Sequence, residues 1–308
     1  MTRTAILCSG QGAQNDAMFD LFADAPAAQP VFQSASRLLG TDPRQLVREA
    51  SSATIHEDKI GQILCCTQVM AAWAVLDNVL PRPLLVAGYS VGELSAWGVA
   101  GLLDATGVLT LAAERAAAMD AATLQPSGLA AIRGLSRGAL ESICRAHGAF
   151  IAIINASDQM LVGGTRTSLV SVIEDAIAAG AVRTTMLPVT VASHTPLLAS
   201  ASEIFRQKLK TFLMRIDMPP DIRLLSGIDG ETVINVSAGA AKLACQIRQT
   251  VDWAACMDAC RAAGVTKVIE LGPGAALARM ASDMIPYADV HSVADFRSIT
   301  GLLTWSRK

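Results

Sequence analysis

The sequence predicts an α/β protein in which a mostly parallel sheet is covered by helices. Short apolar runs of strand length alternate with longer stretches of helical length, and this alternation is typical of parallel sheets. Hydrophobic residues make up 52% of the 308 residues, a content that argues against a disordered chain. The length is that of one core domain with a smaller companion.

The first part of the core is predicted by apolar runs that end at glycine or proline. The run Thr4 to Cys8 predicts a buried strand, and a glycine-containing loop at 9–14 follows it. The apolar segment 58–80 has the length of a helix and stops before Pro81. The other elements expected here are a strand at 84–87 and helices at 91–101 and 104–123.

Residues 124–189 are expected to form a small inserted domain. The breaker cluster Gln125-Pro126-Ser127-Gly128 stands at its start, and Pro188 closes it. Its expected elements follow the order βαββαβ, at 129–133, 136–146, 150–154, 160–163, 166–179 and 182–187. This is the split order of a ferredoxin-like unit. The core is then predicted to comprise 1–123 and 190–308.

After the insertion the chain is expected to return to the core. The expected elements are helices at 195–213, 239–248 and 252–263 and strands at 222–226 and 267–271. The last strand runs into Gly272-Pro273-Gly274, and a final helix is expected from Ala275.

Composition and charge exclude several classes of function. The net charge of −2 with 17% charged residues gives no basic footprint for nucleic acid. No apolar run approaches 18 residues, so no membrane span is expected. The seven cysteines are scattered without a CxxC pair, which indicates reduced thiols and a cytoplasmic protein. Cys256 and Cys260 lie one helical turn apart, but without a second ligand pair they indicate core packing, and no metal is expected.

The segment Gly88-Tyr89-Ser90-Val91-Gly92 predicts a nucleophile elbow. An apolar strand precedes it and a helix follows it, as in an α/β-hydrolase-like core. Glycines two residues before and after Ser90 let neighbouring backbone pass without a clash. The alternative is a serine in a purely structural turn. The strand and helix on either side favour Ser90 as the nucleophile.

A serine nucleophile needs a base, and the chain holds four histidines. His194 stands where a predicted strand ends and a helix begins, just after the insertion. His56 lies in a polar stretch, His147 ends a helix of the small domain, and His291 is near the C-terminus. Position therefore favours His194.

Six motifs occur in an order that identifies a known family. They are GQGAQ at 10–14, GYSVGE at 88–93, Arg115, SH at 193–194, QIRQTVDW at 246–253 and ELGPG at 270–274. The chain resembles the malonyl-CoA:acyl-carrier-protein transacylase family over roughly residues 4 to 285. The resemblance implies an acyl transfer in which Ser90 takes a malonyl group from malonyl-CoA and a carrier-protein thiol then accepts it.

The resemblance also assigns roles to the remaining motif residues. It implies that backbone N–H groups of Gln11 and Val91 hold the oxyanion and that Arg115 pairs with the free carboxylate of the malonyl group. The backbone carbonyl of Gln246 would orient His194. No resident cofactor is implied, because the prosthetic arm belongs to the carrier partner. Without the family, Arg115 would be read as a solvated or ion-paired residue on an alanine-rich helix.

Tyr89 separates two members of this family. Relatives in fatty-acid synthesis usually carry histidine there, and 88–102 resembles instead the epsilon subunit of malonate decarboxylase. The favoured prediction is therefore a subunit that charges the acyl-carrier subunit of malonate decarboxylase, in contact with the other subunits. The alternative is the malonyl-CoA:acyl-carrier-protein transacylase of fatty acid or polyketide synthesis. Ala192-Ser193 before the histidine gives weak support for malonyl as the acyl group.

Two further alternatives come from other classes of protein. A serine thioesterase or patatin-like hydrolase would use Asp229, followed by Gly230, as a dyad acid or His291 as a late triad histidine. Asp-Gly is also a favourable turn pair, and this simpler interpretation is preferred. The other alternative is a carrier-docking scaffold without catalysis. The residues that could meet an acidic carrier are Arg183, Arg206, Lys208 and Lys210, although a solvated face is the simpler interpretation.

Overall fold

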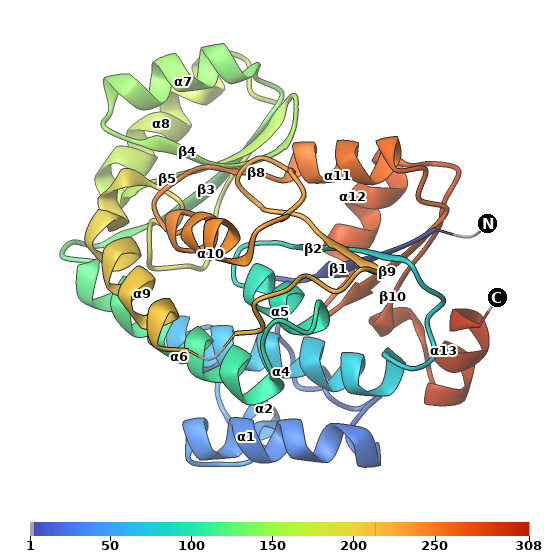
Figure 1. The fold of residues 1–308 in the computed structure, drawn as a ribbon. Helices are drawn as coiled ribbons and strands as arrows, with labels where there is room; N and C mark the ends of the chain where they lie inside the picture. The colour runs from blue at the N-terminus through green and yellow to red at the C-terminus, as the bar shows by residue number, and fades with distance from the viewer. Residues whose placement is uncertain (1–2, 213, 308) are drawn as a thin grey trace.

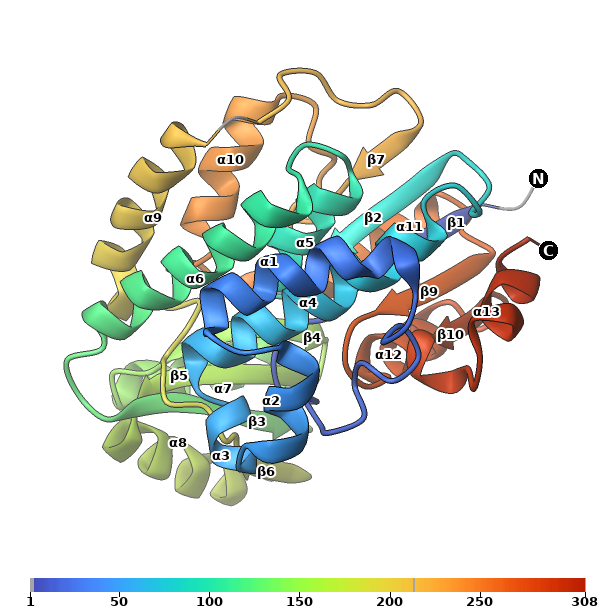
Figure 2. The ribbon, with the colours of Figure 1, turned by 90° about the horizontal axis from the view of Figure 1, so that it is seen from below.

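The core is built on a five-stranded sheet in which every pair of neighbours is parallel. The computed structural model describes residues 3–212 and 214–307. The strand order is β10-β9-β1-β2-β7 (Figure 1; β7 is labelled in Figure 2). The bounds are Thr4–Cys8 for β1, Leu84–Gly88 for β2, Ile222–Leu224 for β7, Lys267–Leu271 for β9 and Asp289–Ser292 for β10. The predicted α/β class with a mostly parallel sheet is confirmed.

Helices cover both faces of this sheet, and the strands are apolar on both sides for that reason. In β1, Ile6 and Cys8 face one core cluster while Ala5 and Leu7 face another. The first cluster is formed with helices that Figure 2 shows in front of the sheet. These are α1 (Gln29–Leu39), α4 (Asp58–Leu76), α5 (Gly92–Val99) and α6 (Ala105–Ala122), with α9 (Ala199–Thr211) and α10 (Val236–Cys245) beside them. The second face packs against α11 (Trp253–Ala262) and α12 (Ala276–Met284).

Helix α4 is the central helix of the first cluster. By length and composition it could cross a membrane, contrary to the expectation from the sequence. Polar residues interrupt its apolar run, so no unbroken apolar stretch of that length is present. However, 78% of its apolar window is buried inside the protein, as expected of a core helix. It ends at Leu76, so the predicted end at residue 80 is wrong. Turns fill residues 77–79, and Leu80 directly after them is still buried in the first cluster.

The small domain has the strand order predicted for a ferredoxin-like unit. Its sheet runs β6-β3-β5-β4, with antiparallel pairs throughout, and α7 and α8 pack on it. The bounds are Ser127–Arg133 for β3, Arg137–Ala146 for α7, Phe150–Ala156 for β4, Gln159–Thr165 for β5, Arg166–Ala178 for α8 and Arg183–Met186 for β6. A fifth strand, β8 (Val251–Asp252), pairs in parallel with β4. Since β8 lies outside the predicted range 124–189, chain from the core extends this sheet.

Several elements differ from the sequence prediction. The predicted helix 195–213 begins with a 3-10 turn, η2 (Pro196–Leu198), before α9, and residue 213 lies outside the described residues. Other elements went unpredicted in the segments 26–55 and 289–306. Besides α1 and β10, they are η1 (Pro26–Ala28), α2 (Pro43–Glu49), α3 (Ser52–Ile55), η3 (Val293–Asp295) and α13 (Ile299–Ser306).

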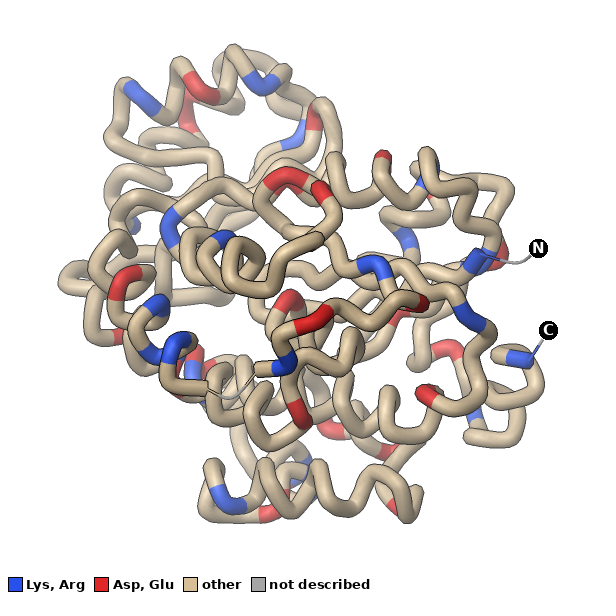
Figure 3. Tube along the Cα trace, viewed as in Figure 1, with Lys and Arg blue, Asp and Glu red and all other residues tan. Residues whose placement is uncertain are grey.

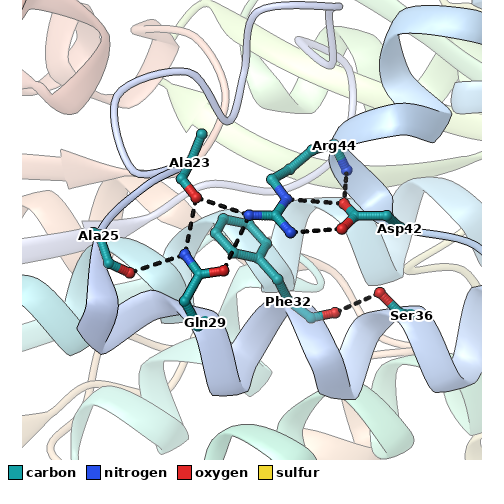
Figure 4. A network of polar contacts seen from close by, with 7 residues as sticks. All are labelled: Ala23, Ala25, Gln29, Phe32, Ser36, Asp42 and Arg44. Carbon is teal, nitrogen blue, oxygen red and sulfur yellow. Dashed lines mark hydrogen bonds and ion pairs between the residues drawn. The ribbon is translucent and has the colours of Figure 1, made fainter.

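One arginine joins α1 to α2 through a network of polar contacts (Figure 4). Asp42 caps α2 by accepting from the Arg44 amide, and the Arg44 guanidinium donates to both oxygens of the same carboxylate. Arg44 also donates to the Ala23 carbonyl at 2.8 Å and lies over the Phe32 ring. This network anchors the helical segment to the loop that leads out of β1.

Candidate active site

Ser90 lies at a sharp turn between the end of β2 and the start of α5. Its φ of 55° is in the left-handed region, where residues other than glycine are uncommon. The turn requires glycine on both sides of Ser90, because other backbone segments pass very close to Gly88 and Gly92. A Cβ on Gly88 would collide with the backbone of Glu93, and one on Gly92 would collide with the Cys8 carbonyl. The sequence therefore folds here as the predicted elbow.

His194 lies beside Ser90 with its ring held at both nitrogens. Its Nε2 is 2.8 Å from Ser90 Oγ, and its Nδ1 is 2.7 Å from the Gln246 carbonyl oxygen. A carbonyl oxygen only accepts, so Nδ1 carries the proton and Nε2 is free to accept from the serine hydroxyl. His194 is 1% exposed, has a φ of 62° and donates its backbone N–H to the Ile247 carbonyl.

The surroundings of His194 keep its imidazole neutral. Burial and, to a smaller extent, the nearby positive charge of Arg115 lower the pKa of His194 to about 3, against a smaller opposing effect of the Gln246 carbonyl. A neutral imidazole is the form that can take a proton from serine. The geometry and the charge distribution therefore provide a hydroxyl paired with a base.

Arg115 reaches the same group of residues from α6. Its guanidinium is buried, with the side chain 1% exposed, and it donates to Gln62 Oε1 at 2.8 Å and Gln246 Oε1 at 3.3 Å. Among residues 3–212 and 214–307, no carboxylate lies within ion-pairing distance of it. Its hydrogen-bond partners are neutral amides, while the charges of Asp58 and Glu93 act on it without forming an ion pair. A buried guanidinium with no direct ion pair could hold an anionic ligand, because burying a charge without a direct partner is costly.

The loop that follows β1 lies against the elbow. A Cβ on Gly10 would come within 2.7 Å of the Tyr89 carbonyl oxygen, so the two segments are in close contact. The backbone N–H groups of Gln11 and Val91 donate no hydrogen bond to any residue that the structure describes. Val91 stands directly before the first turn of α5. Such free amides are the groups that stabilise a developing oxyanion.

The small domain contacts the elbow through Tyr89. Its hydroxyl donates to Asn155 Oδ1 of β4 at 3.1 Å, and its ring meets the Trp253 ring edge-on, with centroids 5.4 Å apart. Three residues that contact the predicted site residues were not themselves predicted. They are Gln62, which bonds to Arg115, Glu93, which bonds to Gln246, and Asn155, which bonds to Tyr89. Gln62 is one of two buried amides, with Gln68, in the mostly apolar helix α4, so the sequence pattern alone did not single it out.

The residues that a hydrolase would use lie elsewhere. Asp229 forms an ion pair with Lys242 at 2.5 Å, and His291 packs against the rings of Phe296 and Trp305. Ser90 contacts neither of them through a hydrogen bond in the described chain. The thioesterase and patatin-like alternatives are therefore not supported by the geometry.

Two of the four basic residues considered for carrier contact, Arg206 and Lys208, are already paired with carboxylates. Arg206 pairs with Glu203 and Lys208 with Glu114, and Figure 3 shows positive and negative residues interspersed along the trace. The two cysteines considered for metal binding are buried, and Cys256 donates to the Ser226 carbonyl. No group of three or more metal-ligating side chains occurs among the described residues.

Comparison with known proteins identifies the family. Residues 6–301 match the family model described as acyl transferase domain. The chain belongs to the acyl transferase domain family. This acyltransferase is 29% identical to the malonyl CoA-acyl carrier protein transacylase of Mycobacterium bovis, over 97% of this chain and 99% of the relative. The family resemblance predicted from the motifs is thereby confirmed.

Solved structures agree with this assignment. The acyltransferase superposes on the acyl-carrier-protein S-malonyltransferase of Burkholderia pseudomallei with a TM-score of 0.90 and 29% identity, covering 98% of this chain and 100% of that one. The corresponding values for MCAT from Mycobacterium tuberculosis are 0.89 and 28%, with coverage of 99% and 100%. The fold and the family therefore agree over the whole length.

Proposed function

We propose that this acyltransferase moves a malonyl group from malonyl-CoA to the thiol of an acyl-carrier protein, as the transacylase of fatty acid or polyketide synthesis does. The names of the relatives support the donor and the acceptor. The observation that carries the choice of acyl group is Arg115, a buried guanidinium without a carboxylate partner in the described chain. Because Arg115 and His194 both bond to Gln246, the cation lies close to the serine.

In the first half-reaction, Ser90 Oγ attacks the thioester carbonyl carbon while its proton passes to His194 Nε2. The resulting oxyanion accepts from the backbone N–H groups of Gln11 and Val91, and each such donor is worth about 10²–10³ in rate. The tetrahedral intermediate collapses with cleavage of the C–S bond. The proton on His194 goes to the departing thiolate of CoA, and a malonyl ester remains on Ser90.

The second half-reaction reverses these steps with a different thiol. The carrier thiol gives its proton to His194 and attacks the ester carbonyl. Cleavage of the C–O bond returns the proton to Ser90, and the malonyl group leaves on the carrier. Throughout both steps the malonyl carboxylate pairs with the Arg115 guanidinium, which stays charged at any working pH.

All of these groups belong to the chain itself, so we propose that the reaction needs no resident cofactor. The pantetheine arms arrive with CoA and with the carrier. The seven cysteines are free thiols, six of them buried, and this supports a cytoplasmic location.

A role in malonate decarboxylase is the second candidate, and it rests on Tyr89. The relatives are named as a malonyl CoA-acyl carrier protein transacylase and an acyl-carrier-protein S-malonyltransferase, which favours the transacylase of fatty acid or polyketide synthesis over the decarboxylase subunit. A competition between two carriers decides the matter. One carries a phosphopantetheine arm and the other the longer arm derived from dephospho-CoA. Preferential loading of the first supports the transacylase, and preferential loading of the second supports the decarboxylase subunit.

The covalent intermediate is the direct test of the proposed function. Intact-mass measurement after brief mixing with malonyl-CoA and acid quenching should show one added malonyl group on the wild type. Ser90→Ala should show none, while Ser142→Ala, which changes an exposed serine on α7, should acylate normally. A wild type without the adduct, or an adduct that survives Ser90→Ala, would contradict the proposal.

A further inference from the structure

Glu93 is a buried carboxylate behind the elbow that takes no part in the proposed steps of acyl transfer. It lies in the first turn of α5, three residues after Ser90, and is 1% exposed. One carboxylate oxygen, Oε2, accepts from Gln246 Nε2 at 2.6 Å and from the Gly227 amide at 3.2 Å. The backbone of Glu93 packs against Gly88 on the far side of the turn. Its side chain therefore has one dominant partner, Gln246.

Gln246 connects the three groups on which the proposed reaction depends. Its side-chain Nε2 donates to the Ser90 carbonyl at 3.0 Å as well as to Glu93. Its Oε1 accepts from Arg115, and its main-chain carbonyl accepts from His194. The elbow at Ser90, the base His194 and the guanidinium of Arg115 are therefore all hydrogen-bonded to Gln246.

The two ends of an amide have nearly the same shape, so packing alone does not decide which end faces Arg115. A carboxylate only accepts hydrogen bonds. Glu93 therefore requires the NH₂ end of Gln246 on its own side, which turns Oε1 toward the guanidinium. With the amide reversed, the N–H donors of Arg115 would face the NH₂ group of Gln246, which is also a donor. The Ser90 carbonyl oxygen would then face the amide oxygen, which is also an acceptor.

We infer that Glu93 is a positioning residue: it fixes the orientation of the Gln246 amide that faces Arg115, and it anchors the residue whose main-chain carbonyl holds His194. This inference rests on the proposed function for its effect on malonyl transfer. Glu93 itself forms and breaks no covalent bond. Its effect is carried by the hydrogen bonds that converge on Gln246.

The charge of Glu93 adds a pH dependence. Burial, with a smaller contribution from the charge of Asp229, raises the pKa of Glu93 from its ordinary 4.5 to about 7, although the bonds from Gln246 and Gly227 and the charge of Arg115 oppose the rise. Cys256 on α11 is the other ionisable group that interacts with it, and burial raises the pKa of that thiol, so it stays neutral. Below pH 7 the protonated acid no longer requires the NH₂ end of the amide. Activity should therefore rise as Glu93 ionises through about pH 7, and His194, already neutral, should not contribute to this rise.

The variant Glu93→Gln keeps the volume and removes the obligate acceptor. We expect kcat/KM for malonyl-CoA to fall on the order of tenfold, the ratio of acetyl to malonyl transfer to rise, and the increase in rate around pH 7 to disappear. The matched control is Glu114→Gln, which removes a carboxylate next to Arg115 in sequence but on the solvent side, where it pairs with Lys208. It should change none of these quantities.

A second readout does not depend on the acyl substrate. The Nδ1 proton of His194 in the bond to Gln246 should give a low-field NMR signal in the wild type, and Glu93→Gln should shift or broaden it. If the wild type forms no malonyl adduct but this signal responds, the proposed function fails and the positioning role stands. If Glu93→Gln does not fold, Glu93→Asp replaces it and should keep the rise in rate at a shifted midpoint. Unchanged rates, pH profile and NMR signal in the variant that folds would overturn the inference.

Discussion

At the scale of single residues, the environment of Arg115 predicts a loss of acyl selectivity when it is removed. Arg115→Ala should lower the rate of Ser90 acylation by malonyl-CoA by about 10²-fold or more, because it removes the charge-assisted bidentate pair that we propose for this buried site. Acylation by acetyl-CoA has no carboxylate to lose and should survive or rise. Quenched-flow mass measurement with both thioesters gives the ratio.

Arg115→Lys serves as the control for charge in this experiment. Lysine keeps the positive charge but not the fork that matches a carboxylate, so malonyl transfer should recover only in part. An equal loss of malonyl and acetyl transfer in Arg115→Ala would mean that the guanidinium has a purely structural role.

The sequence predicted some of these residues and missed others for a physical reason. Ser90 lies in a local sequence pattern that can be recognised without the fold. A strand and a glycine precede it, and a glycine and a helix follow it. Arg115 and Gln62 lie on different helices and are 53 residues apart in the sequence. Gln246 and Glu93 are 153 residues apart. No local pattern encodes such contacts, so the partners of Arg115 and the role of Glu93 became visible only in the folded structure.

At the scale of elements, the close packing of β1 under the elbow predicts that Gly92 tolerates no side chain. Its hypothetical Cβ falls on the Cys8 carbonyl at the end of β1, which is backbone and cannot swing away. Gly92→Ala should therefore lower the free energy of unfolding by about 3 kcal/mol or more. Urea denaturation followed by circular dichroism measures the change.

Gly138→Ala is the matched control for this change. Gly138 lies in the first turn of α7, and a Cβ there meets nothing within 4 Å. Alanine should leave the stability unchanged or raise it by up to about 1 kcal/mol, since it is the better helix former. If both variants had similar stability, the close approach of β1 to the elbow would be wrong.

Except for the 11-residue helix α1, the elements that sequence analysis missed are short or depend on distant contacts. Helix α2 begins with an Asp42 cap and a proline at its first position, and α3 with a Ser51 cap, so both starts carried readable signals. Neither segment has enough length for an apolar period to appear. The two residues of β8 have no strand pattern at all and are extended because they pair with β4.

At the scale of the whole molecule, the order of elements was predictable because alternation specifies a parallel sheet with few permitted connections. What alternation does not give is how the two sheets are joined. The strand β8 and the contact of Tyr89 with Asn155 both tie the small domain to the core beside Ser90. The elbow is therefore formed by core residues alone but is held between two domains.

The stability of the whole chain against pH provides the last prediction, through Glu270. This buried residue of β9 accepts from Ser9 Oγ at 2.7 Å and from the Ala278 amide at 2.8 Å, and so joins the loop after β1 to the start of α12. Burial raises the pKa of Glu270 to about 7 from its ordinary 4.5, despite these donors. The folded state therefore binds a proton that the unfolded state releases between these values. Its stabilising contribution is complete below pH 4.5 and is lost as pH rises through 7.

The free energy of unfolding should fall between pH 5 and pH 8 by on the order of 2 kcal/mol more in the wild type than in Glu270→Gln. The variant is expected to be less stable at pH 5, because an amide cannot accept from both donors, so the slope and not the absolute value is the test. The raised pKa of Glu93 and the lowered pKa of His194 have opposite effects on the slope, but both groups are present in the two proteins and cancel. Glu141→Gln, which changes an exposed carboxylate on α7, should retain the wild-type slope. Identical slopes in Glu270→Gln and the wild type, measured by urea denaturation at the two pH values, would show that Glu270 is already ionised at pH 5 and that its two donors outweigh its burial.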